Sequence, residues 1–289
     1  MNPQVKTAAR RRRVVLALAA GMAVLAASGC PRVGPASRGE QPAGKLVLTG
    51  SSTVAPLAAE IAKRYEGLYP GVRIDVQSGG SSRGISDARR GLADVGMVSR
   101  ALKEGEEDLR AFPIARDGIC MIVHGTSPIR ELTGAQIADI YTGRITNWRE
   151  VGGVDRRIVV VNKAQGRSTL ELFLAHFKLE SSAIRAHIVI GDNQQGIKTV
   201  AGSRAAIGYV SIGSAEYDAR HGTRIKLLPL GGVAATTASV RDGSYPLSRD
   251  LNLVTLGEPG PLAAAFIEFA RWGETGDLAE KLSFVSIAN

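Results

Sequence analysis

Short apolar runs alternate with longer amphipathic segments along most of the chain. Positions 72–76 alternate between apolar and polar residues, and 157–162 form a near-continuous apolar run. Both patterns are typical of strands, the second of a strand buried on both faces of a parallel sheet. Between 54 and 69 the apolar residues recur instead at helical spacing. Strands that alternate with helices predict an α/β fold with mostly parallel sheets.

The same patterns give the expected elements along the chain. Strands are expected at 45–49, 72–76, 94–98, 114–124, 157–162, 188–190, 206–210, 224–230 and 251–255. Helices are expected at 54–69, from 85, at 104–111, 133–141 and 170–177, from 197, and at 261–272. The stretch 142–153 has no regular period and indicates a structured connection.

Several of these strands end in a polar turn that opens a helix. The turns are 50–53, 77–84 and 163–169, with a possible fourth at 191–196. Helix N-termini carry unpaired N–H groups and a positive dipole end, and ligands of open α/β sheets bind at the carboxyl ends of strands. These turns together predict one shared cleft that binds a small oxyanion. Each turn taken alone could also be an ordinary turn in which a serine caps the helix. The candidate donors are Ser52, Thr53, Ser81, Ser82, Ser99, Arg167, Ser168 and Thr169.

Composition fits a folded protein but not a nucleic-acid binder. The 289 residues are 44% apolar and 22% charged, enough for one large domain or two α/β lobes. The formal charge of +9 would suggest nucleic-acid binding, but five of the 36 basic residues lie in the first 13 positions. The rest of the chain has 31 basic against 27 acidic residues, and aromatic residues make up only 5%. Platforms for stacking bases are therefore scarce.

The first 30 residues are expected to be a targeting signal. A basic segment precedes the apolar run 14–27, and small residues then lead to Cys30. The end of this segment resembles a bacterial lipoprotein signal, which implies lipidation of Cys30; it departs from that pattern at Ala27, where leucine is preferred. A plain signal-peptidase site is the alternative. Residues 31–44, rich in Pro, Gly and Ser, are expected to form a flexible tether.

Other chemistries are weakly supported. No cluster of His, Cys and acidic residues has metal-ligand spacing, and no phosphate-binding P-loop motif occurs, so neither a metal nor another cofactor is expected. The second cysteine, Cys120, lies in an apolar run and is expected to be a buried free thiol. Residues 80–84 fit the nucleophile elbow of a serine hydrolase, with Ser82 as nucleophile and His221 as the best candidate base.

Five motifs in order resemble the phosphate-binding proteins of bacterial ABC phosphate transporters, from about Leu46 to the C-terminus. They are Gly50–Val54, Ser78–Ser82, Asp94–Met97, Tyr141–Gly153 and Ala206–Tyr209. The resemblance implies a type II periplasmic binding-protein fold, in which two α/β lobes close on one phosphate. It implies crossings near 124–127 and 245–249, with lobe 1 at 45–124 plus 246–289 and lobe 2 at 125–245.

The same resemblance implies a biological role. We expect a monomeric, non-enzymatic protein, lipid-anchored to the membrane in the periplasm or at the cell surface. It would deliver phosphate to a permease and ATPase in other chains. Binding of another oxyanion, such as sulfate or molybdate, and a sensing role without transport remain alternatives.

Carried over residue by residue, the resemblance implies a phosphate site with two departures. Thr53 and Val54 match the first-loop contacts, Ser81 matches the second-loop serine, and 167–169 replace a Ser-Gly-Thr sequence. Ser99 stands where well-known members have an aspartate that accepts the phosphate proton. Lys163 stands where they have an arginine. We expect Ser99 to take the acceptor role, with weaker rejection of sulfate.

Overall fold

The computed structural model describes residues 41–272 and 275–287. The strands are β1 (Gly44–Gly50), β2 (Val72–Ser78), β3 (Val95–Val98), β4 (Leu109–His124), β5 (Val159–Lys163), β6 (Ile188–Ile190), β7 (Ala206–Ser211), β8 (Ile225–Leu228), β9 (Ser248–Leu256) and β10 (Val285–Ser286). The helices are α1 (Ala55–Leu68), α2 (Ser81–Arg89), α3 (Gly134–Tyr141), α4 (Ser168–Phe177), α5 (Asn193–Ala201), α6 (Ile212–Arg220), α7 (Thr237–Arg241), α8 (Pro261–Trp272) and α9 (Gly276–Lys281). Two short 3-10 helices are η1 (Trp148–Val151) and η2 (Ser181–Ala183).

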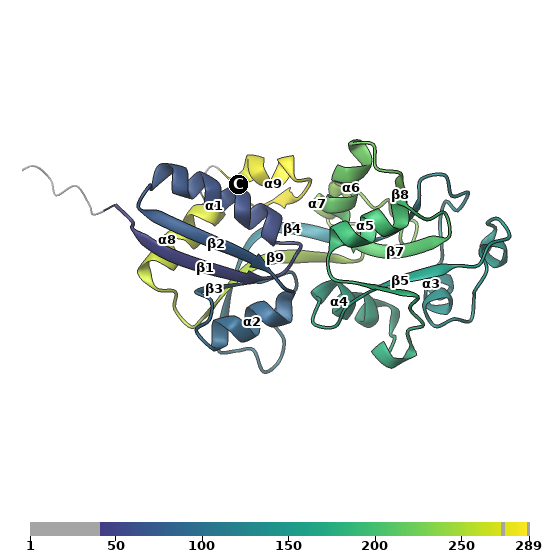
Figure 1. The fold of residues 1–289 in the computed structure, drawn as a ribbon, viewed down its shortest axis with the longest axis horizontal. Coiled ribbons are helices and arrows are strands. Elements are labelled where there is room, and N and C mark those ends of the chain that lie inside the picture. The colour runs from purple at the N-terminus through teal and green to yellow at the C-terminus, as the bar shows by residue number, and fades with distance from the viewer. Residues whose placement is uncertain (1–40, 273–274, 288–289) are drawn as a thin grey trace, which may run out of the picture. The chain divides into compact units, whose positions relative to one another are not determined.

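Hydrogen-bonded strands run through the whole fold in the order β2-β1-β3-β9-β4-β7-β5-β6. β1 is parallel to both of its neighbours, β2 and β3, and β5 is parallel to β6 and β7. The parallel triplets lie at the two ends of this order, and the antiparallel strands β9 and β4 lie between them (Figure 1). The predicted α/β class is confirmed, with antiparallel strands added at its centre.

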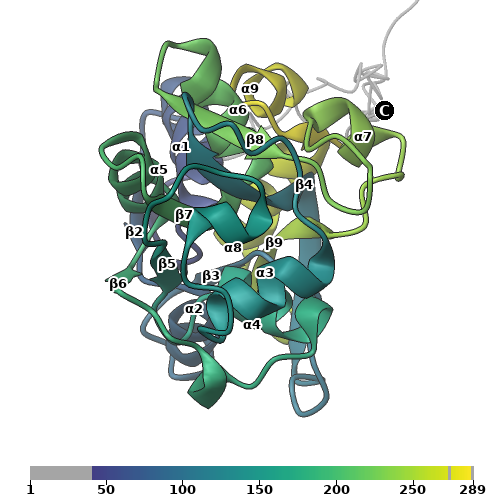
Figure 2. The ribbon, with the colours of Figure 1, turned by 90° about the vertical axis from the view of Figure 1, so that its right-hand side faces the viewer.

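Two separate hydrophobic cores define two α/β lobes. In the first lobe, Tyr65 of α1 packs edge-on against Phe266 and Phe269 of α8. In the second, Phe173 of α4 stacks on Tyr209 of β7 with ring centroids 4.1 Å apart. Figure 2 shows the second lobe, with α5 and α6 on one side of β5 and β7 and with α3 and α4 on the other. The expected two-lobe architecture is confirmed.

The strands β4 and β9 pass between the lobes (Figure 1). β4 pairs with β9 as far as Gly118 and with β7 from Ile119 onward. The first crossing therefore lies earlier than the expected 124–127. The reason is that one unbroken strand of 16 residues serves both lobes, and its apolar end from Ile119 to Val123 already belongs to the second core. Cys120 is buried within this end of β4, as predicted.

One expected helix is wrong, and several elements were not predicted. Residues 104–108 form turns, and 109–111 begin β4. Glu106 accepts hydrogen bonds from Arg100 and from the backbone of Lys103, which fixes a turn, while the following residues pair with β9. Pairing with a distant strand thus overrides local helix propensity. The structure also contains elements for which no bounds were expected, namely α6, α7, α9, β10 and the two 3-10 helices.

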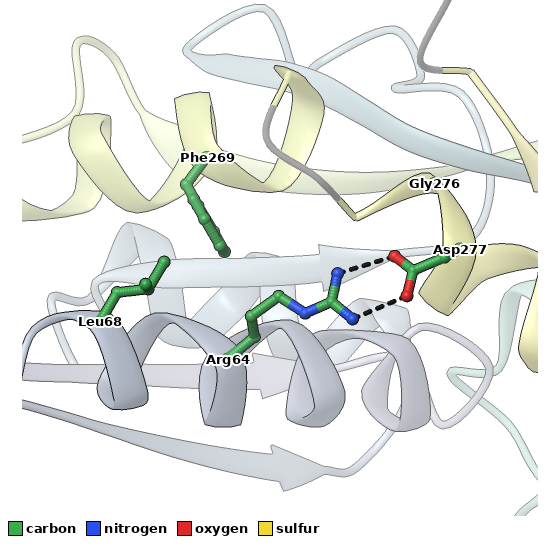
Figure 3. Close-up of a pocket in the computed structure, with 5 residues that line it drawn as sticks. All are labelled: Arg64, Leu68, Phe269, Gly276 and Asp277. Carbon is green, nitrogen blue, oxygen red and sulfur yellow. Dashed lines mark hydrogen bonds and ion pairs between the residues drawn. The ribbon is translucent and has the colours of Figure 1, made fainter.

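The C-terminal helix α9 is tied to α1 by an ion pair. Arg64 donates to both carboxylate oxygens of Asp277, each at 2.7 Å, beside the apolar side chains of Leu68 and Phe269 (Figure 3). Both partners are exposed to solvent, so the pair contributes little to stability. Its geometric effect is to hold α9 against α1, the last and the first helix of the described residues.

Residues 1–40 lie outside the described part of the chain. The predicted signal, Cys30 and most of the predicted tether therefore remain predictions. Among the helices that are described, none is long and apolar enough to cross a membrane.

Candidate functional site

Three helices that follow the predicted polar turns begin without a side-chain cap. Their N-cap residues are Val54 for α1, Gly80 for α2 and Arg167 for α4, and none accepts a backbone hydrogen bond through its side chain. The helix after the possible fourth turn differs, because Asp192 caps α5 by accepting from Gln195 N. The N-cap side chains of α3, α6 and α7 also accept such bonds. A helix N-terminus favours an anion through its dipole. Some of the N–H groups are already engaged here: those of Thr53 and Val54 donate to Ser51 Oγ, and that of Ser82 donates to the carbonyl oxygen of Gly166.

Two glycines let these turns approach other backbone segments closely. Gly50 has a φ of 135°, and a Cβ there would lie 2.3 Å from the carbonyl oxygen of Met97. Gly80 has a φ of 101°, and a Cβ there would lie 2.6 Å from the carbonyl oxygen of Gly166 in the other lobe. Any larger residue at either position would push the turns apart.

Arg249 at the start of β9 lies at the centre of the predicted hydroxyl groups. Its side chain is 1% exposed. Nη1 donates to Thr169 Oγ1 at 3.0 Å and to Ser99 Oγ at 3.3 Å, and Nη2 donates to Thr53 Oγ1 at 3.2 Å. Three predicted site residues thus gather around one buried guanidinium. Thr53 and Thr169 come from polar turns of the two lobes, and Ser99 directly follows β3.

Asp117 of β4 neutralises this guanidinium from behind. Its Oδ2 accepts from Arg249 Nη2 at 2.9 Å and from Nε at 3.3 Å, and its Oδ1 accepts from Gly213 N at 3.1 Å. The two residues face each other in the register of β4 and β9, and the Asp117 side chain is also 1% exposed. Such a pair fixes the plane of the guanidinium, which is the geometry needed to bind an oxyanion.

Serine hydroxyls connect the first, second and third strands at the same place. Ser51 Oγ lies 2.9 Å from Ser99 Oγ, and the backbone N–H of Ser99 donates to Ser81 Oγ at 3.2 Å. All three side chains are buried. The carboxyl ends of β1 and β3 and the start of α2 are thereby locked into one polar cluster.

Lys163 and Asn193 complete the cluster from the second lobe. Lys163 Nζ donates to Asn193 Oδ1 at 3.0 Å, and Asn193 Nδ2 donates to Thr53 Oγ1 at 3.1 Å. Lys163 is only 3% exposed. Burial, together with the charges of Arg249 and Arg167, lowers the pKa of its ammonium group from 10.5 to about 7, and Asp192 offsets this only in part.

A family model for the PBP superfamily domain matches residues 35–271. The chain belongs to the PBP superfamily. It is 26% identical over 274 residues to the phosphate-binding protein PstS of Bacillus subtilis, covering 91% of this chain and 89% of that protein.

Two solved structures of phosphate transport proteins are also similar to this chain. A candidate phosphate ABC transporter substrate-binding protein of Clostridium perfringens, solved with bound phosphate, has a TM-score of 0.78 and 32% identity, covering 84% of this chain and all of that one. An ABC-type phosphate transport receptor of Vibrio cholerae has a TM-score of 0.69 and 28% identity, covering 83% and 99%. The resemblance to phosphate-binding proteins expected from the motifs is confirmed.

Two predicted ligands in this PBP-superfamily chain have a buried polar side-chain atom without a hydrogen-bond partner. Ser168 Oγ and Arg167 Nε are buried and form no hydrogen bond among the described residues. Arg167 reaches between Gly80 of the first lobe and Gly191 of the second. A buried polar group without a partner is costly, and a bound anion would satisfy both groups.

The remaining predicted residues lie at the edge of the cluster. Val54 is fully buried in the first core, so only its backbone can face an anion. Ser52 is half-buried and lines a pocket of about 230 Å³ between α1 and α5. Ser82 is exposed, and its Oγ lies 3.3 Å from Glu171 Oε1 on α4.

No histidine lies in position to act as the general base that the hydrolase interpretation of Ser82 requires. All four histidines lie in the described part of the chain, and none forms a hydrogen bond with Ser82. His221, the best candidate, caps the end of α6 and bonds the carbonyl oxygen of Tyr217. Within the same residues no group of three His, Cys, Asp or Glu side chains could hold a metal ion.

The lobes are in contact across the site. Besides the bonds of Arg249 to Thr169 and of Asn193 to Thr53, Glu171 of the second lobe pairs with Arg100 at 2.9 Å and with Lys103 at 2.6 Å. These contacts describe a closed cleft, with the hydroxyl cluster inside it and the ion pairs at its edge.

Sequence reasoning missed the central residues of the cluster. Arg249, Asp117 and Asn193 were not among the predicted ligands, and Lys163 was considered only as a departure from the family pattern and as the next candidate after Arg167. One signal was present in the sequence: Asp117 interrupts the apolar run 114–124. A charge in such a run is almost never fully buried unless it is paired, so a buried basic partner could have been sought.

Proposed function

We propose that this PBP-superfamily protein binds inorganic phosphate between its lobes and delivers it to an ABC permease for uptake. The observation that carries the proposal is the buried Arg249 guanidinium surrounded by the hydroxyls of Thr53, Ser99 and Thr169. The relatives named for phosphate binding and phosphate transport support the choice of anion.

The chemistry of the cluster suits a tetrahedral oxyanion. Four acceptor oxygens taken out of water need many donors, and hydroxyls, N–H groups and a guanidinium are the appropriate set. Each charge-assisted hydrogen bond contributes about 1.5–3 kcal/mol, so a handful gives an affinity of about 1 μM or tighter after desolvation. Binding of this kind makes and breaks no covalent bond, which fits delivery and not catalysis.

The cellular setting is proposed from the sequence patterns alone. Cleavage of the signal at 1–30 and lipidation of Cys30 would hold the protein at a membrane in the periplasm or at the cell surface. The segment 31–44 would act as its tether. We propose a monomer with lobe 1 at 45–118 plus 246–289 and lobe 2 at 119–245, because β4 leaves β9 for β7 after Gly118. Separation of these lobes about the crossing strands would admit and release the anion.

Calorimetric titration of the purified protein with inorganic phosphate tests the function. We expect one site per chain with a dissociation constant of about 1 μM or below. We also expect a rise in melting temperature with phosphate concentration, because the anion stabilises only the native state. Absence of binding at millimolar phosphate, in protein shown to be folded, would contradict the proposal.

Replacement of Arg167 by alanine tests the lobe-2 arginine separately. Loss of its charge-assisted hydrogen bonds should weaken phosphate binding by about 1.5–3 kcal/mol for each bond that it makes, while the melting temperature without phosphate stays near that of the wild type. Arg83→Ala is the control, because Arg83 is exposed and pairs with Asp87 on its own helix. Equal affinities of the two variants would remove Arg167 from the site.

A further inference from the structure

The direction of the hydrogen bonds around Ser99 follows from counting donors and lone pairs. A serine hydroxyl has one proton and two lone pairs. Ser51 Oγ accepts from the backbone N–H groups of Thr53 at 3.2 Å and Val54 at 3.4 Å. Both of its lone pairs are then engaged, so its proton is the one shared with Ser99 Oγ at 2.9 Å.

The Ser99 hydroxyl has no free lone pair and can act toward a ligand only as a hydrogen-bond donor. Its Oγ accepts from Ser51 and also from Arg249 Nη1, and a guanidinium can only donate. Two lone pairs are therefore occupied, and the free O–H group faces the cluster as a donor. This reverses the role expected from the sequence, in which Ser99 would accept the proton of phosphate.

Thr53 is constrained in the same way from the other side. Asn193 Oδ1 accepts from Lys163 Nζ and from the backbone N–H of Ser211, which turns Asn193 Nδ2 toward Thr53. Thr53 Oγ1 thus accepts from Asn193 and from Arg249 Nη2, and its own proton remains free. The two hydroxyls closest to the guanidinium from the first lobe are both pure donors.

The carboxylate at the cluster cannot serve as the missing acceptor. Asp117 receives two hydrogen bonds from Arg249 and one from Gly213, and it lies behind the guanidinium. An ionised carboxylate that faced the ligand would repel an oxyanion without a proton, at a cost of several kcal/mol. Two further carboxylates nearby are also engaged. Glu171 pairs with Arg100 and Lys103 at the edge of the cleft, and Asp192 caps α5.

We infer that Ser99 determines specificity as a hydrogen-bond donor, and that the site takes doubly charged tetrahedral oxyanions as a class, sulfate as well as phosphate. This inference rests on the proposed function. Sulfate carries no proton near neutral pH, and a site of donors satisfies all four of its oxygens. Phosphate binds through its unprotonated oxygens, and its one proton gains no special partner.

Calorimetric titration of the full chain with phosphate and with sulfate at pH 8 tests the inference. We expect the two dissociation constants to lie within about tenfold of each other. Rejection of sulfate by more than about thousandfold would overturn the inference and leave phosphate binding intact. Binding of neither anion would contradict the proposed function, and the inference with it.

Two variants of Ser99 separate donor from acceptor. Ser99→Ala should weaken phosphate and sulfate by similar factors of about tenfold or more, because each loses one donor. Weakening of phosphate alone would show that Ser99 accepts the proton, and unchanged affinity for both anions would show that it does not bind them. Ser99→Asp should weaken sulfate at least about a hundredfold relative to phosphate. If a variant does not fold, the wild-type ratio still decides.

Discussion

Replacement of Arg249 by methionine is expected to abolish phosphate binding at micromolar concentrations and to destabilise the fold. The guanidinium supplies the central positive charge and connects hydroxyls of Thr53, Ser99 and Thr169. Its loss should cost more than about thousandfold in affinity, since the central positive charge disappears together with the bonds that orient these three hydroxyls. The free energy of unfolding should fall by about 3–5 kcal/mol, because Asp117 then stays buried without a partner.

A double variant separates the two effects. Asp117→Asn combined with Arg249→Met removes the uncompensated charge but keeps an acceptor for the N–H of Gly213. Denaturant unfolding should show that most of the lost stability returns, and calorimetry should show that binding does not. Arg116→Met is the matched control, because Arg116 pairs with Asp250 on the same two strands but at an exposed position, worth about 0–1 kcal/mol. Retention of phosphate binding within tenfold in Arg249→Met would exclude the proposed role of Arg249.

The parts of the site that the sequence predicted are those with local patterns. Thr53, Ser81 and Thr169 each stand where a strand pattern gives way to a helix pattern through a short polar turn. Parallel strands bring such turns to the same edge of a sheet, so local reading together with the fold class placed their hydroxyls on one site.

The central cation could not be found in this way. Arg249 lies 196 residues from Thr53, 132 from Asp117 and 80 from Thr169 in the sequence. No periodicity links positions at such separations, and the contact exists only because β9 pairs antiparallel with β4 where the lobes meet. The family resemblance implies a crossing segment near 245–249, which describes the backbone there but not the direction of the Arg249 side chain.

The same reasoning explains the errors in the fold. The segment 104–111 has helix-forming residues, but its last three are drawn into β4 by pairing with β9. The residues after Gly118 belong to the second lobe because they pair with β7. An apolar run in the sequence does not show which strand it will pair with. Local structure was thus predictable from local sequence, and errors arose where a distant strand decides.

Without ligand, the stability of the protein is expected to rise as the pH increases from about 7 toward 10. Burial lowers the pKa of Lys163 from 10.5 in the unfolded chain to about 7 in the fold. Between these values the unfolded state holds one more proton than the folded state, so raising the pH favours folding. The free energy of unfolding should gain up to about 1.4 kcal/mol per pH unit from this group. Below pH 7 both states are protonated, and the contribution becomes constant at its least favourable value.

Lys163→Met should remove this rise, while Lys198→Met, an exposed lysine on α5, should keep it. Asn193 still accepts from the N–H of Ser211 in Lys163→Met, so the orientation of its amide is retained.

A bound dianion favours the charged ammonium of Lys163, so phosphate binding at pH 8 should take up protons in the wild type and fewer in Lys163→Met. Denaturant unfolding from pH 7 to 9.5 and calorimetry in buffers of different ionisation enthalpy measure the two effects. The same slope in Lys163→Met as in the wild type would show that Lys163 keeps its ordinary pKa, and Lys163 would then be charged in the site at every physiological pH.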